Sequence, residues 1–310
     1  MTRLSIIGVI LLALGIALVF AYQAADRETM AAAEFRADSG YQTVTLSHGV
    51  TAYIDYGPRD GQPIIIVHGG TLGSMAYQGY VPPLVAAGYR VVIYDQYGRG
   101  FSDRPHDALS IDLMRLQLRD LMDALNIQKA NLFGVSFGGA IIARFAGAHN
   151  ARVRALAYQV PVIEGGSVSP TLALARMPFI GPMLMRFIAL PSIIARGESF
   201  GTETDAARRV VAHFTSQFSV QGTQRHMRDL LVGDALSDRM GDHRIIGPSG
   251  LPAQFAYAVD DTEIAAAQVE AAFALYDAPD VHQYEGGHFF SSGHMDKLTA
   301  DLDKFFKSVD

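Results

Sequence analysis

The sequence predicts an α/β fold: a mostly parallel, doubly wound sheet with a helical insertion, preceded by a hydrophobic helix at the N-terminus. Three observations support this prediction. Strand-like and helix-like patterns alternate over residues 41–160 and again over residues 250–310, as expected for parallel strands joined by right-handed helical crossovers. Residues 161–249 contain helix-like runs interrupted by prolines and no strand-like run. An uncharged apolar stretch lies close to the start of the chain.

The apolar stretch runs from Ser5 to Tyr22 and reads SIIGVILLALGIALVFAY. It is close to the minimum length for a helix that spans a bilayer. Arg3 precedes it and acidic residues follow it, so the positive-inside rule places the short tail in the cytoplasm and the rest of the chain outside, as in a periplasmic domain. We therefore expect residues 1–25 to be an uncleaved membrane anchor. Cleavage as a signal peptide, which would give a secreted protein, is less favoured because Tyr or Gln stands where a small residue is required.

Residues 26–40 are an Ala-rich segment of mixed charge, which we expect to be a connector. Alternating apolar residues from Tyr41 onward then predict a hairpin. The runs at 64–67 and 90–94 are continuously apolar and β-branched, which is typical of strands buried on both faces of a parallel sheet. Residues 113–125 have the spacing of an amphipathic helix. The α/β core is therefore expected to comprise residues 41–160 and 250–310.

The composition narrows the classes of function. The chain has 310 residues, a formal net charge of −6 and no cysteine. The lack of cysteine excludes disulfides, thiol catalysis and cysteine metal sites in this chain. The acidic balance gives no reason to expect a nucleic-acid partner. No metal-ligand constellation or nucleotide-binding glycine pattern is visible, so we expect no cofactor and no metal. The insertion at 161–249 is rich in Met, Phe, Ile and Leu, and we expect it to form a helical cap over an apolar pocket.

The most informative motif is Gly134-Val135-Ser136-Phe137-Gly138. A short apolar strand precedes it and a helix-like run follows it, which is the setting of a nucleophile elbow. Such a turn is strained and crowded, so the flanking positions require glycine. The motif predicts that Ser136 is a catalytic nucleophile.

A serine nucleophile needs a histidine base, and the base needs a carboxylate to orient it. Both follow Ser136 in the order serine, acid, histidine. His288 comes after a strand-like segment and two glycines, and we expect it to be the base. His294, six residues later, is expected to be a surface residue of the last helix. For the acid we choose Asp261 at the end of a strand, while Asp260 and, more remotely, Glu164 remain alternatives.

Acyl transfer also requires donors for the developing oxyanion. A strand-like run ends in His68-Gly69-Gly70. We expect the backbone N–H groups of Gly70 and Phe137 to form the oxyanion hole. His68 precedes the serine, which is the wrong order for a base, and we expect it to hold the loop by hydrogen bonds.

These motifs resemble those of the α/β-hydrolase superfamily, in the capped group of small carboxylesterases and monoglyceride lipases. Four of them occur in the expected order between residues 41 and 308. They are His-Gly-Gly at 68–70, Asp-x-x-Gly-x-Gly-x-Ser at 95–102, the elbow at 134–138 and Gly-Gly-His-Phe at 286–289. The resemblance implies structural roles for Asp95 and Arg99. The chain departs from it at Ala258, where the family often has glycine, and this leaves the choice between Asp260 and Asp261 open.

The resemblance implies a serine hydrolase, because haloalkane dehalogenases and epoxide hydrolases of this superfamily carry aspartate at the position of Ser136. We expect hydrolysis of a small to medium hydrophobic acyl ester through an acyl-enzyme. Two alternatives remain. A proline iminopeptidase-like aminopeptidase shares the His-Gly-Gly motif, although Thr71-Leu72 replaces the Pro-Gly that follows it in that group. A non-catalytic binding protein of the same fold is disfavoured because all three residues of the triad are kept.

Overall fold

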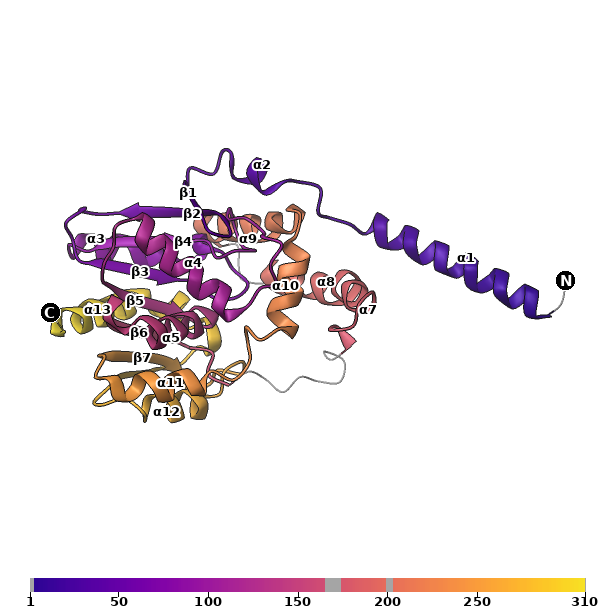
Figure 1. Cartoon of the computed structure of the whole chain (residues 1–310). Helices are drawn as coiled ribbons and strands as arrows, with labels where there is room; N and C mark the ends of the chain where they lie inside the picture. Colours follow the sequence, from indigo (N-terminus) through magenta and orange to yellow (C-terminus); the bar gives the residue numbers. More distant parts are fainter. Residues whose placement is uncertain (1–2, 165–173, 199–202, 310) are drawn as a thin grey trace.

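A computed structural model describes residues 3–164, 174–198 and 203–309, with side chains described from residue 6 onward. Its centre is an eight-stranded sheet in the order β1-β2-β4-β3-β5-β6-β7-β8 (Figure 1). Strand β2 pairs antiparallel with both β1 and β4, and all other neighbours pair parallel. The expected mostly parallel sheet is confirmed. Its strands are β1 (Gln42–Leu46), β2 (Gly49–Tyr56), β3 (Pro63–Val67), β4 (Arg90–Tyr94), β5 (Ala130–Val135), β6 (Val153–Gln159), β7 (Ala253–Ala258) and β8 (Asp280–Tyr284).

Helices cover both faces of the sheet, as a doubly wound fold requires. The core helices are α3 (Val81–Ala86), α4 (Ile111–Ala124), α5 (Phe137–His149), α12 (Ala266–Phe273) and α13 (Ser291–Ser308). In β3, Ile65 and Val67 belong to the apolar core shared with α4 and α5, whereas Ile64 and Ile66 belong to the core shared with α3 and α13. Alternate residues of one strand therefore bury against opposite layers, because successive side chains point to opposite faces.

Further helices lie between β6 and β7, a stretch that we call the β6–β7 insertion. They are α7 (Ile180–Leu184), the π-helical turn η3 (Met185–Ala189), α8 (Leu190–Glu198), α9 (Asp205–Ser216), α10 (Thr223–Val232) and α11 (Met240–Ile246). The described residues of this insertion contain no strand, in agreement with their lack of strand-like runs. Helix α11 packs against the core helix α5, so the last part of the insertion lies on the core itself.

The N-terminal segment forms a long helix, α1 (Arg3–Ala24), which projects away from the rest of the molecule (Figure 1). Residues Ile6–Ala24 have a mean hydropathy of 2.5 and are not buried inside the protein. The following segment includes the short helix α2 (Ala32–Arg36) and packs on the folded domain. Within it, Met30 forms a parallel β-bridge with Val220 of the insertion.

Candidate active site

Ser136 lies at the sharp turn between β5 and α5, with φ +52° and ψ −116°. This positive φ is uncommon for a residue with a side chain and is typical of functional turns. The crowding expected from the motif is present. A Cβ on Gly138 would lie 1.9 Å from the carbonyl oxygen of Val67, and a Cβ on Gly134 would lie 2.5 Å from that of Gly138. These contacts explain why glycine stands on both sides of the serine.

His288 lies in the 3-10 turn η6 (Gly287–Phe289) that follows β8. Gly286 and Gly287 precede it with φ values of +116° and +66°, which glycine adopts without strain. This path brings the imidazole to Ser136, with its Nε2 atom 3.1 Å from the serine Oγ. Its Nδ1 atom is 2.8 Å from Oδ2 of Asp261. Because the carboxylate can only accept, Nδ1 carries the proton and Nε2 is free to accept the serine proton.

The two candidate aspartates after β7 occupy different positions. Asp261 is buried, and its second oxygen, Oδ1, accepts from the amides of Glu263 and Ile264 at 2.7 and 3.0 Å. Burial alone raises the pKa of Asp261, but the hydrogen bond with His288 and those with the two amides outweigh burial and hold it below its usual value. The geometry therefore favours Asp261 as the partner of the histidine.

Asp260 is exposed and turns toward the loop that carries the histidine. Its carboxylate accepts from the amides of Gly286 and Gly287 at 3.0 and 2.9 Å. The hydrogen bonds from Gly287 and Gly286 lower the pKa of Asp260. Asp260 thus contacts the backbone of the loop that carries His288, and Asp261 contacts the imidazole itself.

The two expected oxyanion donors, Gly70 and Phe137, line the same cavity as Ser136. Gly70 follows β3, and Phe137 begins α5. The carbonyl oxygen of Gly70 accepts a hydrogen bond from Nε of the buried Arg99, which holds the peptide in place. Among the described residues, neither the Gly70 nor the Phe137 amide donates to a protein acceptor. Both N–H groups are therefore available for a developing oxyanion.

His68 holds the loop after β3, as the sequence predicts. Its Nε2 accepts from the amide of Gln96 at 2.9 Å, so the proton lies on Nδ1, which donates to the carbonyl of Gly69 at 2.7 Å. Complete burial lowers its pKa to about 4, so the ring is neutral at neutral pH. Asp95 supports the same region by accepting from the amides of Ser74 and Phe101.

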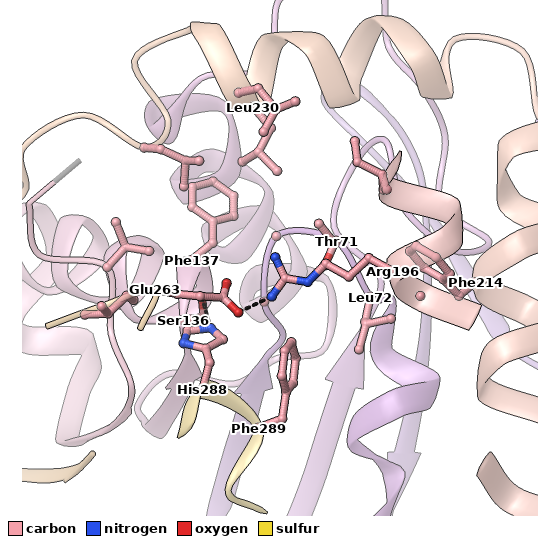
Figure 2. A pocket seen from close by; sticks show the side chains of 18 of the residues that line it. Thr71, Leu72, Ser136, Phe137, Arg196, Phe214, Leu230, Glu263, His288 and Phe289 are labelled. Carbon is pink, nitrogen blue, oxygen red and sulfur yellow. Dashed lines mark hydrogen bonds and ion pairs between the residues drawn. The ribbon is translucent and has the colours of Figure 1, made fainter. Parts of the chain in front are cut away.

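A cavity of about 320 Å³ opens above the serine and histidine. Its wall is mostly apolar, and helices α8, α9 and α10 of the insertion contribute Ile193, Phe214, Leu230 and Leu231 to it (Figure 2). Glu164, the remote candidate for the acid, also lines this cavity. His294 lies at a kink in α13 and is half-buried, with its ring against that of Tyr284 and its Nε2 3.2 Å from the carbonyl oxygen of Glu285, so the expected surface position is wrong.

One charged pair in the cavity wall was not found from the sequence. Arg196 of α8 and Glu263 of the loop after β7 form an ion pair that joins the insertion to the loop of Asp261 (Figure 2). The Arg196 guanidinium also lies over the ring of Phe289, 5.8 Å from its centre. Their separation in sequence leaves no local pattern that could reveal the pairing.

Comparison with known proteins agrees with this geometry. A family model described as alpha/beta hydrolase fold matches residues 62–180, which include the elbow and the His-Gly-Gly loop. The chain has the α/β-hydrolase fold. Among solved structures, the enol-lactonase of Burkholderia xenovorans LB400 has a TM-score of 0.72 and 18% identity, covering 86% of this chain and 100% of that one. A meta-cleavage product hydrolase of Pseudomonas fluorescens IP01 has a TM-score of 0.64 and 24% identity, covering 87% and 98%.

Curated relatives of this α/β-hydrolase match it over shorter stretches. The non-heme chloroperoxidase of Streptomyces lividans is 36% identical over 104 residues, which cover 33% of this chain and 38% of the relative. The haloalkane dehalogenase of Mycobacterium marinum is 37% identical over 99 residues, covering 31% and 33%. The matches thus span less than half of each relative's length.

Proposed function

We propose that this α/β-hydrolase is a membrane-anchored serine hydrolase that cleaves carboxylic esters of small to medium hydrophobic acyl groups through an acyl-enzyme. The contact of His288 with both Ser136 and Asp261 is the observation that carries the proposal, because these three groups form the relay that activates a serine hydroxyl. Residues 161–249 act as the cap in this proposal, and residues 41–160 and 250–310 as the catalytic core.

The first half of the reaction follows from the geometry. Nε2 of His288 takes the proton as Oγ of Ser136 attacks the acyl carbon. The oxyanion of the tetrahedral intermediate is stabilised by the N–H groups of Gly70 and Phe137. Collapse of the intermediate breaks the ester bond, and the leaving alkoxide takes the proton from His288. Asp261 keeps Nδ1 protonated and stabilises the imidazolium while it exists.

The second half repeats these steps with water. His288 removes a proton from a water molecule that attacks the acyl-enzyme, and it returns the proton to Oγ of Ser136 when the acid leaves. The chain, the ester and one water molecule balance these steps. A cavity of about 320 Å³ lies at the lower end of the range for small-molecule sites, which favours esters of modest size.

The membrane anchor is part of this proposal. Helix α1 is long and apolar enough to cross a bilayer, and its described side chains are not buried against the protein. Such a helix is costly in water because it exposes a continuous apolar surface. The charge pattern around it supports a catalytic domain outside the cytoplasm.

The test is a comparison of Ser136→Ala with the unmodified protein and with Ser249→Ala, an exposed serine that does not line the cavity. We expect Ser136→Ala to abolish both the hydrolysis of short p-nitrophenyl esters and labelling by a fluorophosphonate probe. Ser249→Ala should retain both. Persistent labelling of the Ser136→Ala protein would show that the nucleophile is a different residue.

A panel of acyl esters of graded chain length and prolyl amides then tests the substrate class. We expect turnover of the esters and little turnover of the amides. A steep preference for prolyl amides would support the iminopeptidase alternative instead. Absence of both activities in a protein that is folded would support a binding protein.

A further inference from the structure

The longest helix of the insertion presents an apolar face to solvent. Segments α7, η3 and α8 form one helical run from Ile180 to Glu198, with a mean hydropathy of 1.2. Most of the exposed large apolar side chains outside α1 lie on this run or immediately before it. We call this group the insertion patch, and it consists of Leu174, Met177, Phe179, Ile180, Phe187 and Ile188.

Two side chains of the patch expose most of their apolar surface to water, which is energetically unfavourable. Phe179 is 86% exposed and has a φ of +66°, a conformation that is uncommon for a bulky residue. Ile188 is 60% exposed. Large apolar side chains gathered on the exposed face of one helical run mark an interaction site more often than singly scattered ones do.

The opposite face of the same helical run is anchored in the protein. Met185, Leu190 and Ile194 are buried in the main apolar core. The run is therefore two-faced, which is the pattern of a helix that lies in a membrane interface and not of one that crosses the bilayer.

The helices α7 and α8, which carry much of the insertion patch, lie near the end of α1 where it meets the domain (Figure 1). The ring of Tyr22 packs edge-on against Phe187, with centroids 6.3 Å apart. The buried Arg186 guanidinium lies 3.9 Å from the centre of the Tyr22 ring and donates to the Tyr22 carbonyl at 2.7 Å. It also forms an ion pair with Asp26 at 3.0 Å. These contacts hold the patch at the level where α1 leaves the domain.

The helical run and the residues before it, 174–198, contain three arginines, at positions 176, 186 and 196, and one acidic residue, Glu198. Arg186 pairs with Asp26 and Arg196 pairs with Glu263, so the apolar side chains, and not charge, make this face suitable for docking. Tyr22, at the end of α1, has the residue type and position typical of the boundary between the lipid chains and the head groups.

We propose that the insertion patch docks into the outer leaflet of the bilayer that α1 spans, so that the roof of the active-site cavity rests on the lipid surface. This inference rests on the membrane anchoring proposed above. The same helical run continues from the patch to Ile193, Arg196 and Gly197, which line the cavity. Docking therefore places the cavity wall at the membrane, and the substrate class it favours is acyl esters dissolved in the leaflet.

The lack of native cysteine allows a direct test with single-cysteine variants of the full chain. Phe179→Cys and Ile188→Cys report on the patch, and Leu12→Cys reports on α1. The matched control is Ile245→Cys, an exposed apolar residue of α11. Each variant is labelled with an environment-sensitive fluorophore and reconstituted in phosphatidylethanolamine–phosphatidylglycerol vesicles. Quenching by nitroxide-labelled lipid chains is then compared with quenching by aqueous iodide.

We expect the lipid-borne quencher to reach labels at positions 12, 179 and 188, and iodide to reach the label at 245. If position 12 reports lipid but 179 and 188 report water, docking is wrong and anchoring stands. If position 12 also reports water, the anchor itself is wrong. Labels at 179 and 188 that are shielded from both quenchers would show that another copy of the protein covers the patch, which also overturns docking.

An activity measurement adds an independent readout. Phe187→Glu and Ile188→Glu place a charge on the patch without touching the cavity. We expect a severalfold loss of turnover of a long-chain ester held in vesicles, with unchanged turnover of a short water-soluble ester. Ile245→Glu should change neither. Equal loss on both substrates would indicate damage to the fold and would contradict the proposal.

Discussion

Replacement of Asp261 by asparagine removes the charge that orients the catalytic base while keeping the size of the side chain. In the structure, Nδ1 of His288 donates to Oδ2 of Asp261 at 2.8 Å. The other oxygen, Oδ1, accepts from two backbone amides. In the variant, the asparagine carbonyl is therefore expected to take the place of Oδ1, and its amide group then faces the imidazole as a donor.

A donor facing Nδ1 forces the proton of the neutral imidazole onto Nε2, where it can no longer accept from Ser136. Loss of the correct tautomer in a serine–histidine–aspartate relay costs about 10⁴-fold in kcat. We therefore expect Asp261→Asn to lower kcat for p-nitrophenyl butyrate by about three to four orders of magnitude. The assay is steady-state hydrolysis, with circular dichroism as the check on folding.

The matched control is Asp260→Asn. In the unmodified protein, the carboxylate of Asp260 accepts hydrogen bonds from the amides of Gly286 and Gly287. The side-chain oxygen of an asparagine at this position can still accept from them. We expect a loss of less than about tenfold, since one neutral hydrogen bond contributes about 1 kcal/mol. A larger loss for Asp260→Asn than for Asp261→Asn, with both proteins folded, would refute the assignment of the acid.

Three further predictions concern the packing, the pH dependence and the cavity. Gly138→Ala should destabilise the fold by about 3 kcal/mol or more in urea unfolding, because its Cβ would overlap a backbone carbonyl, whereas Gly241→Ala, with open space, should cost little. Burial lowers the pKa of His243 from 6.5 to about 4, so between these two pH values the unfolded state binds a proton that the folded state does not. Stability should therefore decrease as the pH is lowered through this window, by up to about 1.4 kcal/mol per pH unit, and His243→Gln should flatten this dependence. Arg196→Met should raise kcat/KM for long-chain relative to short-chain esters, because it removes a charge from an apolar wall; an unchanged chain-length profile would contradict this. The half-exposed pair with Glu263 should itself contribute less than about 1 kcal/mol to stability.

The strands and the candidate site residues can be predicted from the sequence where the residues that determine their position are neighbours in the chain. The elbow around Ser136 can be predicted because glycine is required by contacts within a few residues. His288 can be predicted because two glycines with positive φ turn the chain toward the serine. The fold class follows from the same logic, since buried parallel strands produce continuous apolar runs.

Features that depend on distant partners could not be predicted. The choice between Asp260 and Asp261 depends on the direction in which each side chain points from the turn after β7. Because the two residues are adjacent and identical, the sequence does not indicate which of them points toward the histidine. The pairing of Arg196 with Glu263 joins two elements brought together only by the fold. The packing of Tyr22 against Phe187 also joins segments that are far apart in the chain.

The ion pair between α8 and the loop after β7 has a consequence for how this enzyme can diversify. Glu263 holds Arg196 through its side chain and, through its own amide, donates to the carboxylate that positions the histidine. In the proposed mechanism, the insertion that lines the cavity is thus joined to the loop that positions the histidine. Exchange of the insertion for that of another hydrolase should therefore change the turnover rate as well as the substrate preference. A grafted insertion would need its own cation for Glu263.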